Sequence, residues 1–232
     1  MSISKPKQAL YEHFATVAKA LGNPQRLELI EHLAQGPRSV DMLATKLGLP
    51  IANVSQHLQS MRRAGLLSAE RDGKFVNYRL ADESVLAAFA SIRTVAERHI
   101  AEVDRIVRGY FNERDDMEPV TREDLVQRLR DGLVTVLDVR PSDEFALGHV
   151  PGAINVPLGE LESRIQEIDP ALEVIAYCRG PWCVMSFEAV AALRRRGLSA
   201  RRLEDGLPEW RAAGMPVDVA PSGESLTEGT QR

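Results

Sequence analysis

Hydrophobic residues follow one spacing in the first half of the chain and another in the second half. Apolar positions at helical spacing occupy these stretches: 8–21, 24–33, 40–47, 51–64 and 82–110. Between the last two stretches, LLSAER and KFVNYRL flank Asp72-Gly73, a pair typical of a hairpin turn. Two short helices followed by a hairpin predict a helix-turn-helix with a wing.

Capping residues support the helix boundaries in this half. Asn23-Pro24 is an N-cap followed by proline at the first helical position, and Ser39 can cap the helix over 40–47. Gly48 follows that helix, at the position where helices commonly end in a glycine.

The second half alternates between strands and helices. Residues 133–139 (LVTVLDV) and 173–177 (EVIAY) are short apolar runs of the kind found in buried parallel strands. A helix over 186–196 and a third strand over 200–203 follow the second run. This alternation predicts a parallel sheet with crossover helices.

The length of 232 residues fits two domains. We expect a helical domain over 1–110, a polar linker over 111–119 that ends in Pro119, and an α/β domain over 120–218. The polar, aperiodic segment 219–232 is expected to be a disordered tail. The fold class is therefore a mainly α winged helix-turn-helix followed by an α/β parallel sheet.

Composition narrows the environment and the partners. With 44% hydrophobic and 27% charged residues the chain resembles ordinary globular proteins. It shows no signal peptide and no membrane-spanning run, so we expect a cytoplasmic protein without a membrane partner. Residues 1–80 hold 11 Lys/Arg against 6 Asp/Glu, whereas residues 118–232 hold 13 against 19. The basic first part is the one expected to meet a polyanion.

The second helix of the helix-turn-helix carries side chains suited to reading DNA. The candidates for base contacts are Asn53, Ser55, Gln56, His57 and Gln59. The candidates for phosphate contacts at the helix end and on the wing are Arg62, Arg63, Arg71, Lys74 and Arg79. The alternative is a protein-binding winged helix in which these charges form a solvated face.

This half resembles the ArsR/SmtB family of bacterial repressors. The resemblance covers residues 8–108 and rests on NxxRLxLIxxL, VxxLAxxLGL, SxHLxxMxxAGLL and RDGKxxxYRL, in that order. It implies a homodimer, joined through its first and last helices, that binds a partly palindromic double-stranded operator. The family's metal ligands are missing, because residues 1–177 hold no cysteine and His99 with Glu102 forms only half a site. We predict no metal and no cofactor.

Cys178 is the residue most suited to chemistry in the second half. It follows a buried strand and precedes a loop and a helix, where backbone amides and the helix dipole stabilise a thiolate. Arg179 adds a cation for anion stabilisation. The alternative is a buried structural cysteine at the end of a strand.

The neighbouring motifs of the second half resemble the rhodanese family across residues 118–218. They are Asp138-Val139-Arg140, EFALGHVPGAINVP, the loop from Cys178 to Ser186, and DGLPEW. The resemblance implies a sulfurtransferase in which Cys178 takes up sulfane sulfur as a persulfide from a small donor, namely a polysulfide, a persulfide or thiosulfate.

This sequence departs from the common rhodanese loop in two ways. The loop is about two residues longer, and Met185 stands where an arginine is common, which weakens the case for thiosulfate. Cys183 lies inside the loop, either as a resolving thiol or as a small apolar residue. Asp143, Glu144 and His149 are candidates for acid–base chemistry, but the motif that contains His149 has a structural role in the rhodanese family, so we do not assign His149 to catalysis. Trp182 is expected at the pocket mouth and Trp210 in the core.

We therefore predict a DNA-binding transcriptional regulator, a repressor, whose rhodanese-like domain carries a persulfide-forming cysteine for sulfane-sulfur sensing or transfer. The alternative is a sulfurtransferase that its winged helix localises or dimerises. A third reading is a rhodanese relic that binds a metalloid oxyanion, which the intact nucleophile position disfavours.

Overall fold

Helices and a small antiparallel sheet form the first lobe. The computed structural model describes residues 4–73, 75–112 and 118–219. The sheet has the order β1-β3-β2 and consists of β1 (Arg38–Ser39), β2 (Leu67–Asp72) and β3 (Phe75–Leu80). The helices around it are α1 (Ser4–Leu21), α2 (Pro24–Ala34), α3 (Val40–Leu47), α4 (Ile51–Arg63) and α5 (Glu83–His99).

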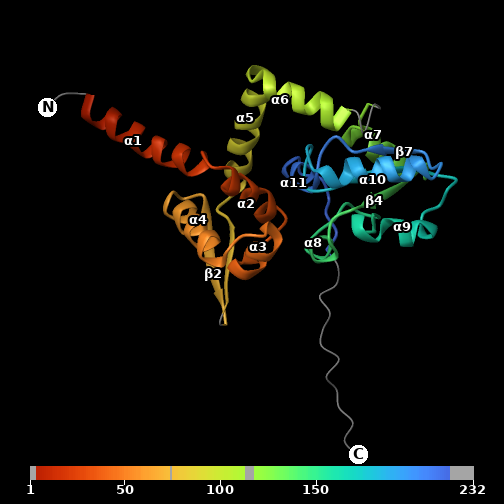
Figure 1. Cartoon of the computed structure of the whole chain (residues 1–232), viewed down its shortest axis with the longest axis horizontal. Helices are drawn as coiled ribbons and strands as arrows, with labels where there is room; N and C mark the ends of the chain where they lie inside the picture. Colours follow the sequence, from red (N-terminus) through yellow and green to blue (C-terminus); the bar gives the residue numbers. More distant parts are fainter. Residues whose placement is uncertain (1–3, 74, 113–117, 220–232) are drawn as a thin grey trace, which may run out of the picture.

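The helix-turn-helix with a wing is confirmed. Helices α3 and α4 follow each other in the chain and pack against each other. The β2–β3 hairpin projects from the body of the lobe (Figure 1). The side chain of Asn23 accepts a hydrogen bond from the Arg26 amide, and Ser39 caps α3 by accepting from the Met42 amide. Gly48 ends α3 with a φ of 64°, in the left-handed region that favours glycine.

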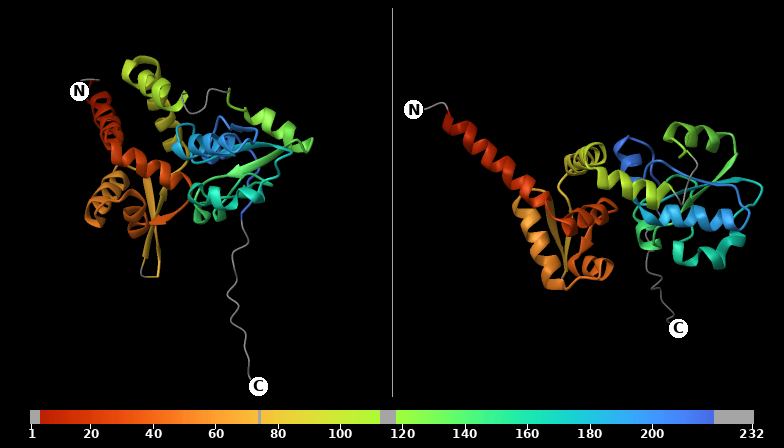
Figure 2. Two further views of the ribbon diagram at one scale, coloured as in Figure 1. Left: turned by 45° about the vertical axis from the view of Figure 1, so that its right-hand side comes forward. Right: turned by 45° about the horizontal axis from the view of Figure 1, so that its top comes forward.

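The long helix expected over 82–110 is broken. Ile100 adopts extended angles (φ −108°, ψ 102°), and the chain continues as α6 (Ala101–Ile106) and a π-helical turn (Val107–Asn112). Figures 1 and 2 show that α5 leaves the first lobe and that α6 runs toward the second. The turn brings Phe111 against Trp182 and Phe187 of the second lobe, with ring centroids 5.1 and 4.8 Å apart. This tertiary contact needs a change of direction that a straight helix does not supply.

The second lobe is built on a parallel sheet, as predicted. The strand order is β5-β4-β6-β7, with β4 (Val134–Asp138), β5 (Ile154–Asn155), β6 (Glu173–Tyr177) and β7 (Ala200–Arg202). Its α-helices are α7 (Arg122–Arg130), α8 (Ser142–Ala146), α9 (Leu161–Arg164), α10 (Val184–Arg195) and α11 (Leu207–Ala212), with 3-10 turns at Leu158–Glu160 and Ile165–Glu167. The helices α7, α8, α9 and α11 and the short strand β5 were not predicted.

Alternate residues of the strands face two separate cores. Val134, Val136 and Ile175 face one core with α7, α11 and Trp210. Leu137, Val174 and Ala176 face the other core with α9 and α10. Because side chains alternate along a strand, Cys178, which follows β6, joins the α10 side. Trp210 is 1% exposed, which confirms its expected place in the core.

Parts of the predicted linker and tail lie outside the described residues, namely 113–117 and 220–232. Among the helices that the structure describes, none has the length and apolar character needed to cross a lipid bilayer.

Candidate functional site

The two cysteines lie in one loop between β6 and α10. Cys178 follows the last residue of β6, and Cys183 directly precedes α10. The structure joins them as a disulfide, with their Cα atoms 6.3 Å apart. Cys178 is 1% and Cys183 8% exposed. In this closed state the sulfur of Cys178 is sealed from solvent, so a reagent reaches it only after the loop opens.

Polar groups at the start of α10 surround the sulfur of Cys178. Its Sγ lies 3.6 Å from Oγ of Ser186 and 3.5 Å from the carbonyl oxygen of Cys183. The Ser186 hydroxyl donates to that same carbonyl at 3.0 Å. The N-terminal end of α10 has a partial positive charge. The helix end favours negative charge on the sulfur, whereas the Cys183 carbonyl oxygen opposes it, so stabilisation of a Cys178 thiolate stays a prediction.

Gly206, in the DGLPEW motif, packs directly against the backbone of the cysteine loop. A Cβ at this position would overlap the backbone of Arg179 and Gly180, so only glycine fits. The next amide, of Leu207, donates to the Cys178 carbonyl at 3.2 Å. Sequence reasoning used this motif for its resemblance and missed its support of the loop, because the two segments meet only in the folded chain.

The Asp-Val-Arg motif forms a buried ion pair. The Arg140 guanidinium donates to both carboxylate oxygens of Asp138, and neither side chain is exposed. The Tyr177 hydroxyl donates to the same carboxylate at 2.5 Å, and burial, followed by the Asp138 charge, raises the pKa of Tyr177 well above its ordinary value. Arg140 also donates to the side chain of Gln35, the residue that follows α2, at 2.9 Å. The motif therefore joins the two lobes.

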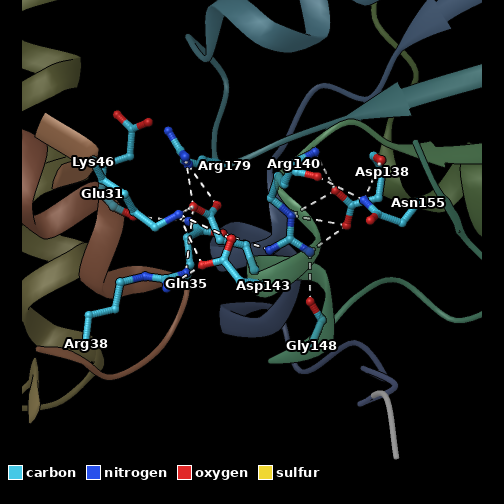
Figure 3. Close-up of polar contacts among 11 residues, drawn as sticks. Glu31, Gln35, Arg38, Lys46, Asp138, Arg140, Asp143, Gly148, Asn155 and Arg179 are labelled. Atoms are coloured by element: carbon cyan, nitrogen blue, oxygen red, sulfur yellow. Dashed lines mark hydrogen bonds and ion pairs between the residues drawn. The ribbon is translucent and has the colours of Figure 1, made fainter. Parts of the chain in front are cut away.

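A second ionic cluster crosses the lobes (Figure 3). Arg38 donates to Asp143 at 2.7 Å, and Nζ of Lys46 lies 3.1 Å from Asp143 and 3.3 Å from Glu144. Arg38 and Lys46 belong to β1 and α3 of the winged helix, whereas Asp143 and Glu144 belong to α8. Nothing local in the sequence marked Arg38 and Lys46 for this contact.

Arg179 is bound to the same cluster. Its Nε and Nη2 donate to the two oxygens of Glu144, each at 2.8 Å. Burial acts to raise the pKa of Glu144, but the hydrogen bonds and charge of Arg179, followed by Lys46, outweigh it and lower that pKa. Glu144 is therefore an anion at neutral pH, and it balances the charge of Arg179 in the closed state. The role of Arg179 in stabilising an anion on Cys178 stays a prediction.

A cavity of about 210 Å³ opens beside Arg179 and is lined by residues of both lobes. His32 lies on its wall, and burial, followed by the charge of Arg179, lowers the pKa of His32 to about 4. His32 is therefore neutral at pH 7. The cationic groups of this wall are Lys46 and Arg179.

His149 has contacts that fix its ring in place. The ring stacks on Phe145 with centroids 3.7 Å apart, and Nδ1 lies 3.0 Å from the Phe145 carbonyl oxygen. These contacts give His149 a structural place against α8.

The predicted DNA-contacting residues lie along α4 and the wing. Asn53, Gln56 and Gln59 are exposed, whereas Val54, Leu58 and Met61 of the same helix are buried. Arg62, Arg63, Arg71 and Arg79 are also exposed, and Ser55 is half-buried. Lys74 lies outside the described residues. The exposed side of α4 is therefore polar and ends in two cations.

His57 differs from its neighbours on α4. Its Nε2 lies 2.7 Å from the Gln25 side-chain oxygen, and its Nδ1 lies 3.4 Å from Nε of Arg26. Burial, followed by the Arg26 charge, lowers the pKa of His57. These contacts tie His57 to α2, so its role in reading bases stays a prediction that requires a rearrangement.

No group of three or more His, Cys, Asp or Glu side chains in residues 4–73, 75–112 and 118–219 is placed to hold a metal ion. Glu102 of the half-site instead forms an ion pair with Arg105.

Comparison with known proteins finds similarity in both lobes. Residues 23–69 match the bacterial regulatory proteins of the arsR family, and residues 121–213 match the rhodanese-like domain. The HTH-type transcriptional regulator Rv0324 of Mycobacterium tuberculosis is 42% identical over 221 residues, which cover 95% of this chain and 97% of that protein. A sulfurtransferase of Allochromatium vinosum is 34% identical over 106 residues, which cover 45% of this chain and 96% of that protein.

Among solved structures, the homodimeric winged helix-turn-helix DNA-binding domain Mb0332 of Mycobacterium bovis (fragment 1–100) is 39% identical to the region it matches. The match covers 43% of this chain and 93% of that domain, with a TM-score of 0.40.

Proposed function

This chain belongs to the HTH-type transcriptional regulators that join an arsR-type helix-turn-helix to a rhodanese-like domain, and we propose that it is a repressor controlled by sulfane sulfur at Cys178. The observation that carries the proposal is the cysteine loop: two thiols within bonding reach, in a loop that contacts the winged helix. In the proposed division of the chain, residues 1–110 form the DNA-binding and dimerisation domain and residues 111–119 form a linker. Residues 120–218 form the rhodanese-like domain that carries the sulfur, and residues 219–232 form a tail.

The proposed sulfur chemistry takes two steps. In the first, the Cys178 thiolate attacks the terminal sulfur of a persulfide R–S–SH, forms Cys178–S–SH and releases R–S⁻. In the second, the Cys183 thiolate attacks Sγ of Cys178, the disulfide forms, and the outer sulfur leaves as HS⁻ with the bonding electron pair. The two cysteines are oxidised and the sulfane sulfur is reduced. The short Cα–Cα distance of 6.3 Å supports Cys183 as the resolving thiol.

The proposed operator surface consists of α4 and the wing. Asn53, Gln56 and Gln59 are exposed on the helix that reads the major groove in this fold, and Arg62 and Arg63 follow at its end. Exposed Arg71 and Arg79 on the hairpin supply further phosphate contacts.

Replacing Gln56 and Arg62 is expected to separate base reading from phosphate binding. Gln56→Ala removes a planar donor and acceptor, so it should cost about 1–3 kcal/mol at one base position and relax sequence preference there. Arg62→Ala removes one phosphate contact, so it should weaken binding to all sequences and lower the salt slope. The measurement is fluorescence anisotropy on operator and random duplexes at several salt concentrations, with exposed Arg196→Ala as control. Equal affinity of Gln56→Ala and wild type for both duplexes would contradict base reading by Gln56.

A homodimer is the proposed assembly. Helix α1 projects from the molecule (Figures 1 and 2), and its Leu10, Tyr11 and Phe14 are between 55% and 61% exposed. On α5, Val95 is 60% exposed. Burying apolar side chains on two helices against a second copy removes this surface from water, and two copies of α4 then fit an operator with two half-sites.

A second candidate function is sulfur transfer as the main activity, with the winged helix serving to localise or dimerise the enzyme. It is favoured by the similarity of residues in the second lobe to the sulfurtransferase of A. vinosum. In that case Cys178 passes its sulfur to an external nucleophile, and the sulfur state leaves DNA affinity unchanged.

The deciding experiment measures operator affinity for wild type and Cys178→Ser, each with and without polysulfide. The DNA is a duplex from directly upstream of the coding sequence. A repressor controlled by sulfur changes affinity only in the treated wild type, by about 5- to 150-fold for a coupling of the usual size. Identical affinity in all four samples would contradict control by sulfur and favour the sulfurtransferase. A response to zinc or arsenite that survives Cys178→Ser would contradict it as well.

A further inference from the structure

The loop segment between Cys178 and Cys183 is joined to the winged helix by a hydrogen bond. The indole Nε1 of Trp182 donates to the Glu97 carboxylate of α5. Trp182 directly precedes Cys183, so a contact that holds its side chain also restricts the backbone that carries the second thiol. The loop segment between the two cysteines is therefore anchored to the winged helix through Trp182.

Neighbouring ion pairs connect Glu97 to the second lobe as well. The Arg93 guanidinium, also on α5, lies 3.8 Å from Glu97 and 3.5 Å from Glu209 of α11. Glu209 in turn accepts from the Gly206 amide at 3.3 Å, and Gly206 packs directly against the loop backbone at Gly180. Helix α5 thus reaches the loop directly through Glu97 and indirectly through Arg93.

Aromatic packing restricts Trp182 further. Its ring is 5.1 Å from that of Phe111, in the π-helical turn that follows α6. It also lies nearly parallel to the ring of Phe187 of α10, with centroids 6.5 Å apart. A small cavity of about 80 Å³ between the domains is lined by Trp182 and Cys183 on one side and by Phe89 and Arg93 of α5 on the other. The loop segment from Trp182 to Cys183 is therefore enclosed by groups of the winged helix.

We infer that Glu97 is a positioning residue for the second sulfur step: through Trp182 it holds the loop in the closed form in which Cys183 reaches Cys178. The inference rests on the proposed function and assigns to the DNA-binding domain a part in the chemistry. The first step involves the thiolate of Cys178 at the end of β6, which Glu97 does not contact among the described residues. The second step requires the Cys183 thiolate to approach Sγ of Cys178, and Trp182 is the residue that moves with Cys183.

Through the Trp182–Glu97 hydrogen bond, the chemical state of the two cysteines can affect the position of α5 in the winged helix. Val85 and Phe89 of α5 pack on the core that also holds Leu58 and Met61 of α4. When the disulfide closes the loop and the Trp182–Glu97 hydrogen bond forms, α5 is held in the position that this hydrogen bond requires. By reciprocity of linked equilibria, a DNA duplex that favours the same position of α5 also favours loop closure.

Four variants separate the two steps. Trp182→Phe removes the hydrogen-bond donor but keeps an aromatic ring, and Glu97→Ala removes the acceptor. Glu97→Gln keeps an acceptor oxygen, and Glu102→Ala is the control. Glu102 is an exposed carboxylate five positions along that pairs with Arg105. Hydrosulfide release after addition of an organic persulfide R–S–SH, whose first step releases R–S⁻ and not hydrosulfide, reports the second step. Persulfide on Cys178, measured by mass spectrometry in a Cys183→Ser background, reports the first.

Trp182→Phe and Glu97→Ala should each slow hydrosulfide release about tenfold, the scale of one hydrogen bond to a charged group, and leave persulfide formation within about twofold of wild type. The double variant should be no slower than either single one, because both remove the same interaction. Glu102→Ala should behave as wild type, and Glu97→Gln, which keeps an acceptor oxygen without the charge, should recover most of the rate lost in Glu97→Ala. Recovery by glutamine excludes misfolding as the cause of the alanine effect.

A second measurement makes the inference testable even where sulfane sulfur is not the signal. Equilibration in glutathione buffers, in which two glutathione thiols reduce the Cys178–Cys183 disulfide and form oxidised glutathione, gives the closure constant directly. Trp182→Phe and Glu97→Ala should shift it about tenfold toward the dithiol. An unchanged closure constant overturns the role of Glu97, whatever the signal is. Absence of persulfide in wild type, with the shift present, would instead overturn the proposed function alone.

Discussion

Cys178→Ser is expected to abolish sulfur loading, so that transfer from polysulfide to cyanide falls to the rate measured without protein. The thiolate is the nucleophile in persulfide formation, and a serine hydroxyl without an adjacent base does not replace it. The measurement combines mass spectrometry of the peptide that contains position 178 with a cyanide assay for thiocyanate.

Cys183→Ser is the matched control, since it changes the other sulfur of the same loop by the same single atom. It should keep the first transfer and form a stable persulfide on Cys178, because no internal thiol remains to displace hydrosulfide. The assignment of the two cysteines would be reversed by a persulfide that forms on Cys183 and not on Cys178.

Asp138→Ala should destabilise the second lobe by about 3–5 kcal/mol, the usual cost of leaving one partner of a buried ion pair without its counter-charge. The Asp138 carboxylate accepts hydrogen bonds from the guanidinium and the amide of Arg140 and from the Tyr177 hydroxyl, and all three residues are fully buried.

Urea unfolding followed by tryptophan fluorescence suits this measurement, because both tryptophans, Trp182 and Trp210, belong to the second lobe. Asp131→Ala, at an exposed position of the same lobe, is the control and should stay within about 0.5 kcal/mol of wild type. A midpoint for Asp138→Ala equal to that of the control would show that the ion pair contributes no net stability.

Local patterns were sufficient to predict much of the fold. The hairpin around Asp72-Gly73, the caps Asn23 and Ser39 and the strand before Cys178 all depend on residues adjacent in the chain. Hydrophobic spacing reports burial on one face of a helix or strand, so these elements could be located before any tertiary contact was known. The position of Cys178 between a buried strand and a helix follows from the same patterns.

Several short elements of the second lobe lacked such a signal, among them helix α7 and strand β5. Helix α7 is largely polar, with Leu125 as its one buried residue, and β5 is only two residues long. Both are stabilised by the sheet they join, β5 by pairing Ile154 with Leu137 of β4. Short elements of this kind depend on tertiary packing more than on their own residues.

The sequence by itself determined the two kinds of lobe, their order and the place of Cys178 between a strand and a helix. Only the tertiary structure decided how the lobes meet: Gln35 binds Arg140 and Arg38 binds Asp143, in each case 105 residues apart, and Glu97 binds Trp182 across 85 residues. It also decided that Gly206 supports the cysteine loop and that the helix breaks at Ile100. Hydrogen bonds and ion pairs between distant segments depend on where folding brings the side chains, and a polar residue has the same local pattern whether its partner is another domain or water.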